Sequence, residues 1–376
     1  MLYELNSSVV ISINLTLYSL FGVSITFIVY ILIVYPYLLR WLAFLFGSKH
    51  ETVGFLDFPS VTIVVPCFNE EVNVSNKLED IFKTRYPKDK MEVLFVDNGS
   101  TDKTVVFLEN LLGSYSFRLI TSPPGKTQAI NKALAISSAE IIVSTDCDTS
   151  WSKDALEKLI QPLACKNIGA VCATPRIRRS IFNSKLNYHI GEWIIRSLES
   201  ELDTCSSLDG RLMAFKKSAL GTIREDASTD DLEITLALRK KGFRSLALRD
   251  VMIEEDCLQT LADELKQIRR RVYQSLFSIA HYRTMLLNPR YGFFGVFILP
   301  SRRLFPIFLP FSLILSLGSA LFLWQIPSII FICMTLFICF FTGNSYKLVQ
   351  VYGISLGWID TVLLKTKGDI WTRKPL

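Results

Sequence analysis

The sequence Ser144-Thr145-Asp146-Cys147-Asp148-Thr149 directly follows an apolar run, residues 141–143. This run predicts a buried strand that ends on two carboxylates. Side chains at positions i and i+2 point to the same side of a strand end, so Asp146 and Asp148 are suited to hold one divalent cation together. An ordinary acidic turn is the alternative, because Asp is common where strands end. The other polar clusters of the chain favour the first interpretation.

Three further apolar runs in the same region also end on polar clusters. Residues 61–65 precede Asn69-Glu70-Glu71, residues 91–96 precede Asp97-Asn98-Gly99-Ser100, and residues 117–121 precede Gly125-Lys126. Segments with helical spacing separate these runs, and this alternation predicts a parallel α/β domain over residues 55–260. Ligands bind at the carboxyl edge of such sheets, so the clusters predict one shared site. The helix that starts at Lys126 offers free amide groups and a positive charge, which suit a nucleotide whose diphosphate is bridged to a metal.

The motifs of this domain resemble, in order and spacing, those of the family 2 glycosyltransferases. They are Val61-Thr-Ile-Val-Val-Pro-Cys-Phe-Asn-Glu70, Val96-Asp-Asn-Gly-Ser-Thr-Asp102, Gly125-Lys-Thr-Gln-Ala-Ile-Asn131 and Asp146-Cys-Asp148. The resemblance implies a GT-A type, Rossmann-like nucleotide-binding domain, a nucleoside-diphosphate sugar donor, and Mg²⁺ or Mn²⁺. It implies that the donor is bound by Pro66, Asn69, Glu70, Asp97, Asn98, Lys126, Asn131 and Asp146, and the metal by Asp148 together with Asp146.

An acidic pair, Asp230-Asp231, precedes an amphipathic helix that ends at Gly242. Such carboxylates could simply be favourable charges at a helix N-terminus, worth about 0.3–1 kcal/mol. The resemblance favours a catalytic role for the pair, with Asp231 as the general base that takes the proton from the attacking hydroxyl. It also matches Gly210 and Arg211, more loosely, to the acceptor-side loop of the family.

A basic segment, Lys266-Gln-Ile-Arg-Arg-Arg271, stands where processive members of the family carry Gln-x-x-Arg-Trp. Gln267 and Arg270 fit that pattern, but Arg271 takes the place of the tryptophan. Guanidinium groups suit the phosphate of a lipid-linked acceptor such as a polyprenyl phosphate, so Gln267, Arg270 and Arg271 are predicted acceptor residues. Contacts with bilayer headgroups are the alternative.

Apolar sequence at both ends of the 376-residue chain predicts a membrane protein. We expect an N-terminal anchor helix at 1–45, basic interfacial helices at 261–303, a helical hairpin at 304–346 that turns at Gln325-Ile326-Pro327, and an interfacial segment at 347–376. The first apolar run is too long for a signal peptide, and basic residues flank the spans on one side. These features predict a multi-pass cell-membrane protein with its α/β domain in the cytoplasm, in contact with the lipid bilayer.

The cysteine and charge patterns restrict the other possibilities. The eight cysteines show no paired metal-type spacing, and reduced thiols in core positions are expected in the cytoplasm. The net charge of +6 comes mostly from the flanks of the apolar segments, so no nucleic-acid partner is inferred.

Together these features predict an inverting glycosyltransferase that acts on a lipid-linked or glycan acceptor at the cytoplasmic membrane face. A processive polysaccharide synthase, similar to hyaluronan, chitin or cellulose synthases, is the first alternative. A catalytically inactive sugar-nucleotide-binding partner protein is the second, although such a protein has no need for an intact set of Asp146, Asp148 and Asp231.

Overall fold

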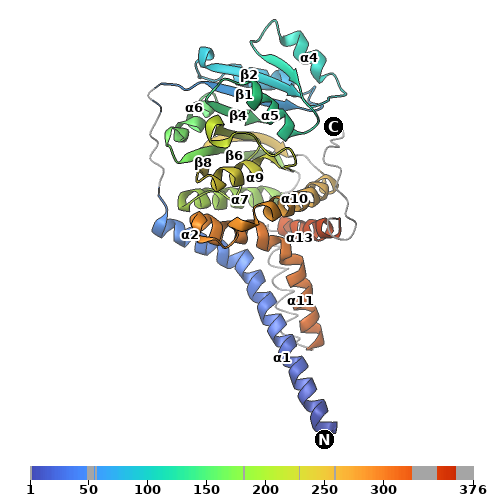
Figure 1. Cartoon of the computed structure of the whole chain (residues 1–376). Helices are drawn as coiled ribbons and strands as arrows, with labels where there is room; N and C mark the ends of the chain where they lie inside the picture. Colours follow the sequence, from blue (N-terminus) through green and yellow to red (C-terminus); the bar gives the residue numbers. More distant parts are fainter. Residues whose placement is uncertain are drawn as a thin grey trace.

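An α/β domain forms one end of the molecule, and two long helices, α1 (Leu2–Val29) and α11 (Leu309–Phe322), extend from its other end (Figure 1). The computed structural model describes residues 2–48, 55, 57–180, 183–227, 229–257, 260–323 and 345–360. The remaining helices are α2 (Tyr35–Phe46), α3 (Val74–Phe82), α4 (Thr104–Leu111), α5 (Lys126–Ile136), α6 (Ala155–Ile160), α7 (Asn183–Leu202), α8 (Lys217–Leu220), α9 (Asp230–Lys240), α10 (Leu261–His281) and α13 (Ser345–Trp358). Shorter helical segments are η1 (Tyr30–Val34), η2 (Lys88–Lys90), η3 (Gln161–Ala164), η4 (Arg283–Met285), η5 (Pro289–Tyr291), η6 (Phe294–Ile298), η7 (Pro300–Leu304) and η8 (Phe305–Phe308).

A mixed sheet with the strand order β3-β2-β1-β4-β7-β6-β8-β5 forms the centre of the domain. Its strands are β1 (Val61–Cys67), β2 (Met91–Asp97), β3 (Arg118–Thr121), β4 (Ile141–Thr145), β5 (Ser150–Trp151), β6 (Ile168–Ser180), β7 (Leu212–Lys216) and β8 (Arg244–Cys257). Strands β1 to β4 are parallel, as the sequence predicts, whereas β7 is antiparallel to β4. The carboxyl ends of β1, β2 and β4 therefore meet at one edge.

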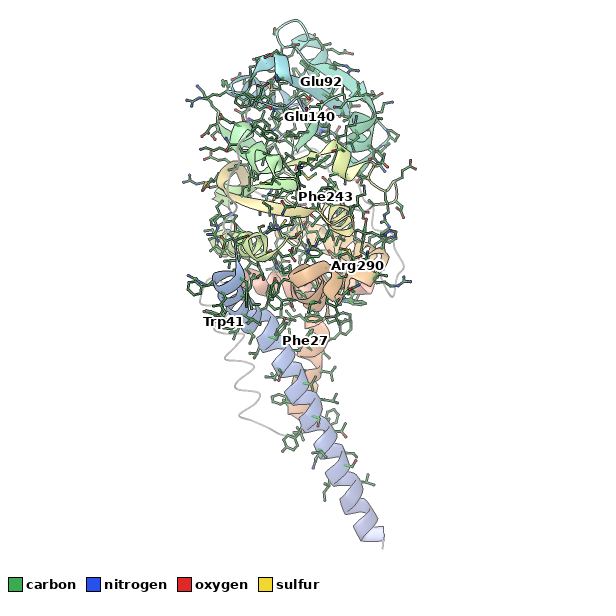
Figure 2. The ribbon with its side chains drawn as sticks, turned by 60° about the vertical axis from the view of Figure 1, so that its left-hand side comes forward. Phe27, Trp41, Glu92, Glu140, Phe243 and Arg290 are labelled. Carbon is green, nitrogen blue, oxygen red and sulfur yellow. The ribbon has the colours of Figure 1, made fainter. Side chains whose placement is uncertain are left out.

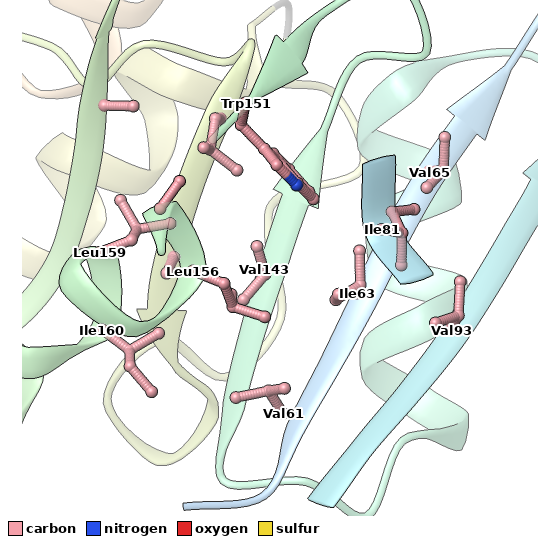
Figure 3. Packing of buried hydrophobic residues seen from close by; sticks show 14 of the residues in the cluster. Val61, Ile63, Val65, Ile81, Val93, Val143, Trp151, Leu156, Leu159 and Ile160 are labelled. Carbon is pink, nitrogen blue, oxygen red and sulfur yellow. The ribbon is translucent and has the colours of Figure 1, made fainter. Parts of the chain in front are cut away.

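Alternating side chains of the strands supply two separate cores, because successive residues of a strand point to opposite faces. Ile63 of β1 and Val93 of β2 lie in the core on one face of the sheet. Ile81 of α3 and Leu156 of α6 belong to the same core (Figure 3). Val64 of β1 packs on the other face, in the core that α5 and α9 complete. The domain is thus a sheet with helices on both sides, and the expected α/β class is confirmed.

A third apolar cluster joins the domain to the helices below it. Tyr35 and Leu39 of α2 pack with Leu236 of α9 and with Phe294. Leu39 has no exposed surface, and burying a leucine completely is worth about 1.5–3 kcal/mol. Helix α2 is therefore part of the folded body, while α1 extends beyond it beside α11 (Figure 1).

Among the described residues, two helices are long and apolar enough to cross a membrane, judged by length and composition: Ile11–Phe46 and Phe294–Phe322. Only 11% and 33% of their most apolar windows are buried, so most of this apolar surface has no cover within the described residues. The second helix begins at Phe294 rather than at 304, because Arg302 does not end it but turns inward to Glu192 and Glu199. The second half of the expected hairpin lies outside the described residues.

Helix α13 lies across the base of the domain, next to α10 (Figure 1). A Cβ atom on Gly353 would come within 2.7 Å of Ile268, and one on Gly357 within 2.9 Å of Val272. The two glycines therefore allow α10 and α13 to approach closely. The description of this segment ends at residue 360, so the expected interfacial segment at 347–376 is described only in part.

Candidate active site

The carboxyl edge of the sheet brings together four charged groups from three segments that are distant in sequence. Lys126 begins α5, Asp146 follows β4, and Asp230 begins α9. The ammonium group of Lys126 lies 2.7 Å from Asp146 Oδ1 and 3.3 Å from Asp230 Oδ2, and it donates a hydrogen bond of 2.7 Å to the carbonyl of Gly210. Asp231 also acts on Lys126 electrostatically. The predicted cluster of donor and catalytic residues is therefore a contiguous group in the fold.

The charges in this group depend on one another. Burial alone would lower the pKa of Lys126, but Asp146 and Asp230 outweigh burial and raise that pKa. Burial raises the pKa of Asp230, and the positive charge of Lys126 opposes this increase. Lys126 thus neutralises two carboxylates rather than pointing freely at a ligand, which differs from its expected role as a separate point charge for a diphosphate.

Gly210 lies against the charged side chains of this cluster. A Cβ atom at this position would come within 3.1 Å of Lys126 Nζ and 3.3 Å of Asp230 Oδ2. The backbone carbonyl of Arg211 accepts hydrogen bonds from the Asp146 amide and from Thr145. The predicted acceptor-side loop is therefore bound directly to the acidic turn that follows β4.

The side chain of Arg211 is paired with a neighbouring carboxylate, that of Asp209. Its guanidinium group forms a bidentate pair with Asp209, which also pairs with Arg196 of α7. Burial alone would raise the pKa of Asp209, but the two arginines hold it well below its usual range. These contacts connect the loop to α7, and an acceptor contact of Arg211 stays a prediction.

The two residues of the acidic pair share Lys126 as a neighbour, but Asp231 also interacts with a second cation. Asp230 lies against Lys126, whereas Asp231 interacts electrostatically both with Lys126 and with Arg303, which belongs to the second apolar helix. Asp231 Oδ1 accepts a hydrogen bond from the backbone amide of Leu232. Asp231 thus interacts electrostatically both with the donor-side cluster and with the helix Phe294–Phe322.

The loops after β1 and β2 hold one another in place. Asp97 is 6% exposed and accepts hydrogen bonds from the amides of Gly99 and Ser100. Asn69, at a positive φ of 57°, accepts a hydrogen bond from the amide of Thr101. The loops that carry Pro66, Asn69, Glu70, Asp97 and Asn98 are therefore adjacent, as the sequence predicts, and their contacts with a nucleotide stay a prediction.

Asn131 has a different environment from these residues. Its side-chain amide donates to the carbonyl of Ile223 and accepts from the amide of the same residue. This reciprocal pair fastens α5 to the segment that precedes α9. The structure thus gives Asn131 a role in holding the fold together, and its proposed contact with the donor has no further support.

Gln267, Arg270 and Arg271 lie on α10, which packs beneath the domain. Ile268 and Val272 face α13, while Arg270 and Arg271 are exposed. On the neighbouring Arg269, the guanidinium group donates hydrogen bonds to both oxygens of Asp360. The two predicted acceptor arginines lie on the exposed surface of α10, and their contact with an acceptor stays a prediction.

The residues after β4 fit a divalent metal that is held partly by its substrate. Among the described residues, no group of three or more His, Cys, Asp or Glu side chains is arranged as a closed metal site. Asp148 is exposed, and Lys126 already engages one oxygen of Asp146. Mg²⁺ is commonly bound by one or two carboxylates together with substrate phosphates, so Asp148 is the residue most suited to hold the ion.

Lys77 is a buried lysine behind the acidic turn that the sequence did not indicate. Its ammonium group donates to the carbonyl of Thr149 at 2.6 Å and to Thr145 Oγ1 at 2.9 Å, and lies 4.4 Å from the centre of the Trp151 ring. Burial lowers the pKa of Lys77 to about 8. Lys77 therefore fixes the two ends of the turn that carries Asp146 and Asp148.

We expect Lys77 to make the stability of the protein depend on pH. Between pH 8 and its ordinary pKa of 10.5 the unfolded chain binds more protons at this residue, so its contribution to folding is full above 10.5 and falls as the pH decreases towards 8. The free energy of unfolding, relative to that of Lys77→Met, should therefore rise by about 1 kcal/mol between pH 7.5 and pH 9. Urea unfolding of both proteins at several pH values measures this difference. A constant difference would show that Lys77 titrates normally.

Comparisons with known proteins agree with this geometry. Residues 62–223 match the family model described as Glycosyl transferase family 2. A beta-monoglucosyldiacylglycerol synthase of Nostoc sp. is 29% identical over 250 residues, which cover 62% of this chain and 53% of that protein. A poly-beta-1,6-N-acetyl-D-glucosamine synthase of Staphylococcus aureus is 25% identical over 221 residues, 56% of this chain and 53% of that protein. The chain thus spans about half the length of these curated relatives.

One solved structure matches nearly the whole chain. The mannosyltransferase PcManGT from Pyrobaculum calidifontis, in complex with GDP-Man and Mn²⁺, aligns with a TM-score of 0.76 and 22% identity. The alignment covers 92% of this chain and 100% of the other. The expected GT-A type fold is confirmed.

Proposed function

Because residues 62–223 form a family 2 glycosyltransferase domain, we propose that the chain is an inverting glycosyltransferase. It moves one sugar from a nucleoside-diphosphate sugar to a lipid-linked acceptor, with a polyprenyl phosphate as the proposed lipid. It acts at the cytoplasmic face of the cell membrane, where the two apolar helices anchor it. The names of the relatives support this acceptor class in part, since one acts on a diacylglycerol lipid and another makes a glycan.

The proposed reaction is a single displacement at the anomeric carbon of the donor sugar. Asp231 accepts the proton of the acceptor hydroxyl as its oxygen attacks, and the bond between the anomeric carbon and the diphosphate breaks on the opposite face. The new bond therefore has the inverted configuration. The acceptor oxygen is itself the nucleophile, so the mechanism needs no nucleophilic side chain. The carboxylate on the acceptor side, Asp231, serves as the base.

The donor-side residues hold the leaving group in the proposed mechanism. Asp97 and the adjacent loop residues bind the nucleotide, and Asp146, kept in place by Lys126, orients the sugar. Asp148 would hold Mg²⁺ or Mn²⁺, and such an ion would supply positive charge next to the leaving diphosphate. The exposed position of Asp148 supports this role, because a substrate phosphate can reach an ion bound there.

The observation that supports the proposal best is the position of Asp231. It interacts electrostatically with Lys126 of the donor-side cluster and with Arg303 of the second apolar helix. An acceptor whose reactive end approaches from the membrane side would therefore meet this carboxylate next to the donor site. A purely nucleotide-binding protein would have no need for such an arrangement.

Transfer is tested by incubating membranes that contain the full chain with a panel of radiolabelled nucleotide sugars. We expect one donor to give a labelled product that is extracted into organic solvent, and Asp231→Asn membranes to give none. Binding of a donor without transfer to any lipid or glycan would favour the inactive partner protein.

A second prediction separates single addition from polymer synthesis. We expect Arg270→Ala/Arg271→Ala to raise the apparent KM for the lipid acceptor about tenfold or more, with the donor KM changed less than twofold, because two phosphate-binding guanidinium groups are lost. Lys266→Ala, an exposed cation on the same helix, is the matched control. Sizing of the product decides the alternative, since a ladder of long chains from the purified protein would identify a processive synthase.

A further inference from the structure

A cavity of about 310 Å³ lies at the C-terminal end of α9, the end opposite to Asp231. It is lined by Arg239, Lys240, Lys241, Gly242, Arg290 and Tyr291. Helix α9 has 11 residues and is therefore about 15 Å long, so the cavity is separate from the donor-side cluster. Four of the six lining residues carry a positive charge.

The C-terminal end of α9 does not present unpaired carbonyl groups that would repel an anion. The C-terminal carbonyls of a helix carry partial negative charge when they are unpaired. Here Gly242, at a φ of 89°, lets the chain turn back, and the amides of Gly242 and Phe243 donate to the carbonyls of Arg239 and Leu238. The cavity therefore presents the cationic side chains rather than unpaired carbonyl groups.

The cations differ in how far they are already neutralised. Arg239 pairs with Asp203 at 2.8 Å and donates to the Tyr291 carbonyl, but its Nε is buried without a hydrogen-bond partner. Lys240 and Arg290 are exposed, and no ion pair within the described ranges involves either of them. Arg239 is thus occupied by Asp203, whereas Lys240 and Arg290 carry charges that no ion pair within the described residues offsets.

The cavity lies at the end of the domain from which the apolar helices extend. Arg290 and Tyr291 immediately precede the helix Phe294–Phe322, which is long and apolar enough to cross a membrane. Figure 2 shows Arg290 at this end of the domain, far from Glu92 and Glu140 at the opposite end. A lipid headgroup at a membrane surface could therefore reach the cavity.

We propose that this cavity binds the phosphate group of an anionic phospholipid headgroup. The exposed side chains of Lys240 and Arg290 donate to the phosphate oxygens, as guanidinium and ammonium groups commonly do. The site holds the domain against the bilayer in a fixed orientation. This proposal rests on the proposed membrane association but not on sugar transfer.

Native mass spectrometry of the full chain in uncharged detergent micelles tests the site by counting bound lipids. The probe is dihexanoyl phosphatidylglycerol, and dihexanoyl phosphatidylcholine is the neutral reference. We expect the anionic lipid to bind more tightly than the neutral one, and Lys240→Ala/Arg290→Ala to weaken its binding about tenfold or more. Both replaced side chains are exposed, so the melting temperature should stay unchanged.

A matched variant distinguishes this cavity from a general effect of surface charge. Arg40→Ala removes an exposed cation from α2, near the end of the other apolar helix, Ile11–Phe46, and should change the affinity less than twofold. Equal losses in the two variants would overturn the proposal. Displacement of the lipid by inorganic phosphate at the same concentration would also overturn it, because the site would then belong to a soluble phosphate compound.

Discussion

Asp231→Asn should lower the turnover of sugar transfer about 100-fold or more, with little change in the affinity for the donor. The amide keeps the size and shape of the side chain but cannot accept the proton of the attacking hydroxyl. The hydrogen bond from the Leu232 amide to Oδ1 can still form to an amide oxygen, so the start of α9 should keep its structure. Steady-state kinetics, together with donor binding measured by calorimetry, check this prediction.

Asp230→Asn is the informative control, because the two residues are adjacent but have different neighbours. Asp230 lies 3.3 Å from Lys126, so its loss removes one of the charges that balance this partly buried ammonium group. We expect weaker donor binding and a smaller loss of turnover in this variant. Formate should partly restore turnover in Asp231→Ala, where a small carboxylate can replace the base, but not in Asp230→Ala. The opposite result would show that Asp230 is the base.

The first four strands were predictable because each is a short apolar run that ends on turn residues. The predicted runs 61–65 and 91–96 differ from β1 and β2 by at most two residues at their ends. Strands β6 and β8 were not predicted. They pair with each other through several register shifts. The apolar start of β6, residues 168–173, gives way to charged residues such as Arg176, and charged residues such as Glu254 also interrupt β8, so neither strand is apolar along its length.

In the site, too, the features that a local sequence pattern marks were predictable, and those that depend on the three-dimensional fold were not. The motifs predicted which residues gather at the carboxyl edge, because parallel strands bring their ends together. They did not predict that Lys126 pairs with Asp230, since this contact depends on β7 inserting antiparallel beside β4 and carrying α9 to the same edge. Lys77 could not be identified at all, because a single lysine in an amphipathic helix has no signature until the sheet buries it.

Asp148→Asn should abolish transfer, and an excess of chelator should do the same to the native protein. The amide is a weaker ligand than the carboxylate for a hard cation, and the leaving diphosphate then lacks the charge that stabilises it. Because Asp148 is exposed, its replacement should leave the melting temperature unchanged. Asp154→Asn, which removes a carboxylate that pairs with Lys158 on the surface, is the matched control and should keep full activity.

Asp146 and Asp148 should respond differently to substitution, although the metal-binding motif contains both. Asp146 is paired with the partly buried Lys126, so Asp146→Asn leaves that ammonium group with less compensation and should lower both stability and donor affinity. Asp148→Asn should instead remove the dependence of nucleoside-diphosphate binding on Mn²⁺ without lowering stability. Calorimetry of nucleoside-diphosphate binding with and without Mn²⁺ measures this dependence in each variant. Full activity of the native protein in chelator, or an unchanged effect of Mn²⁺ in Asp148→Asn, would contradict a metal held by this residue.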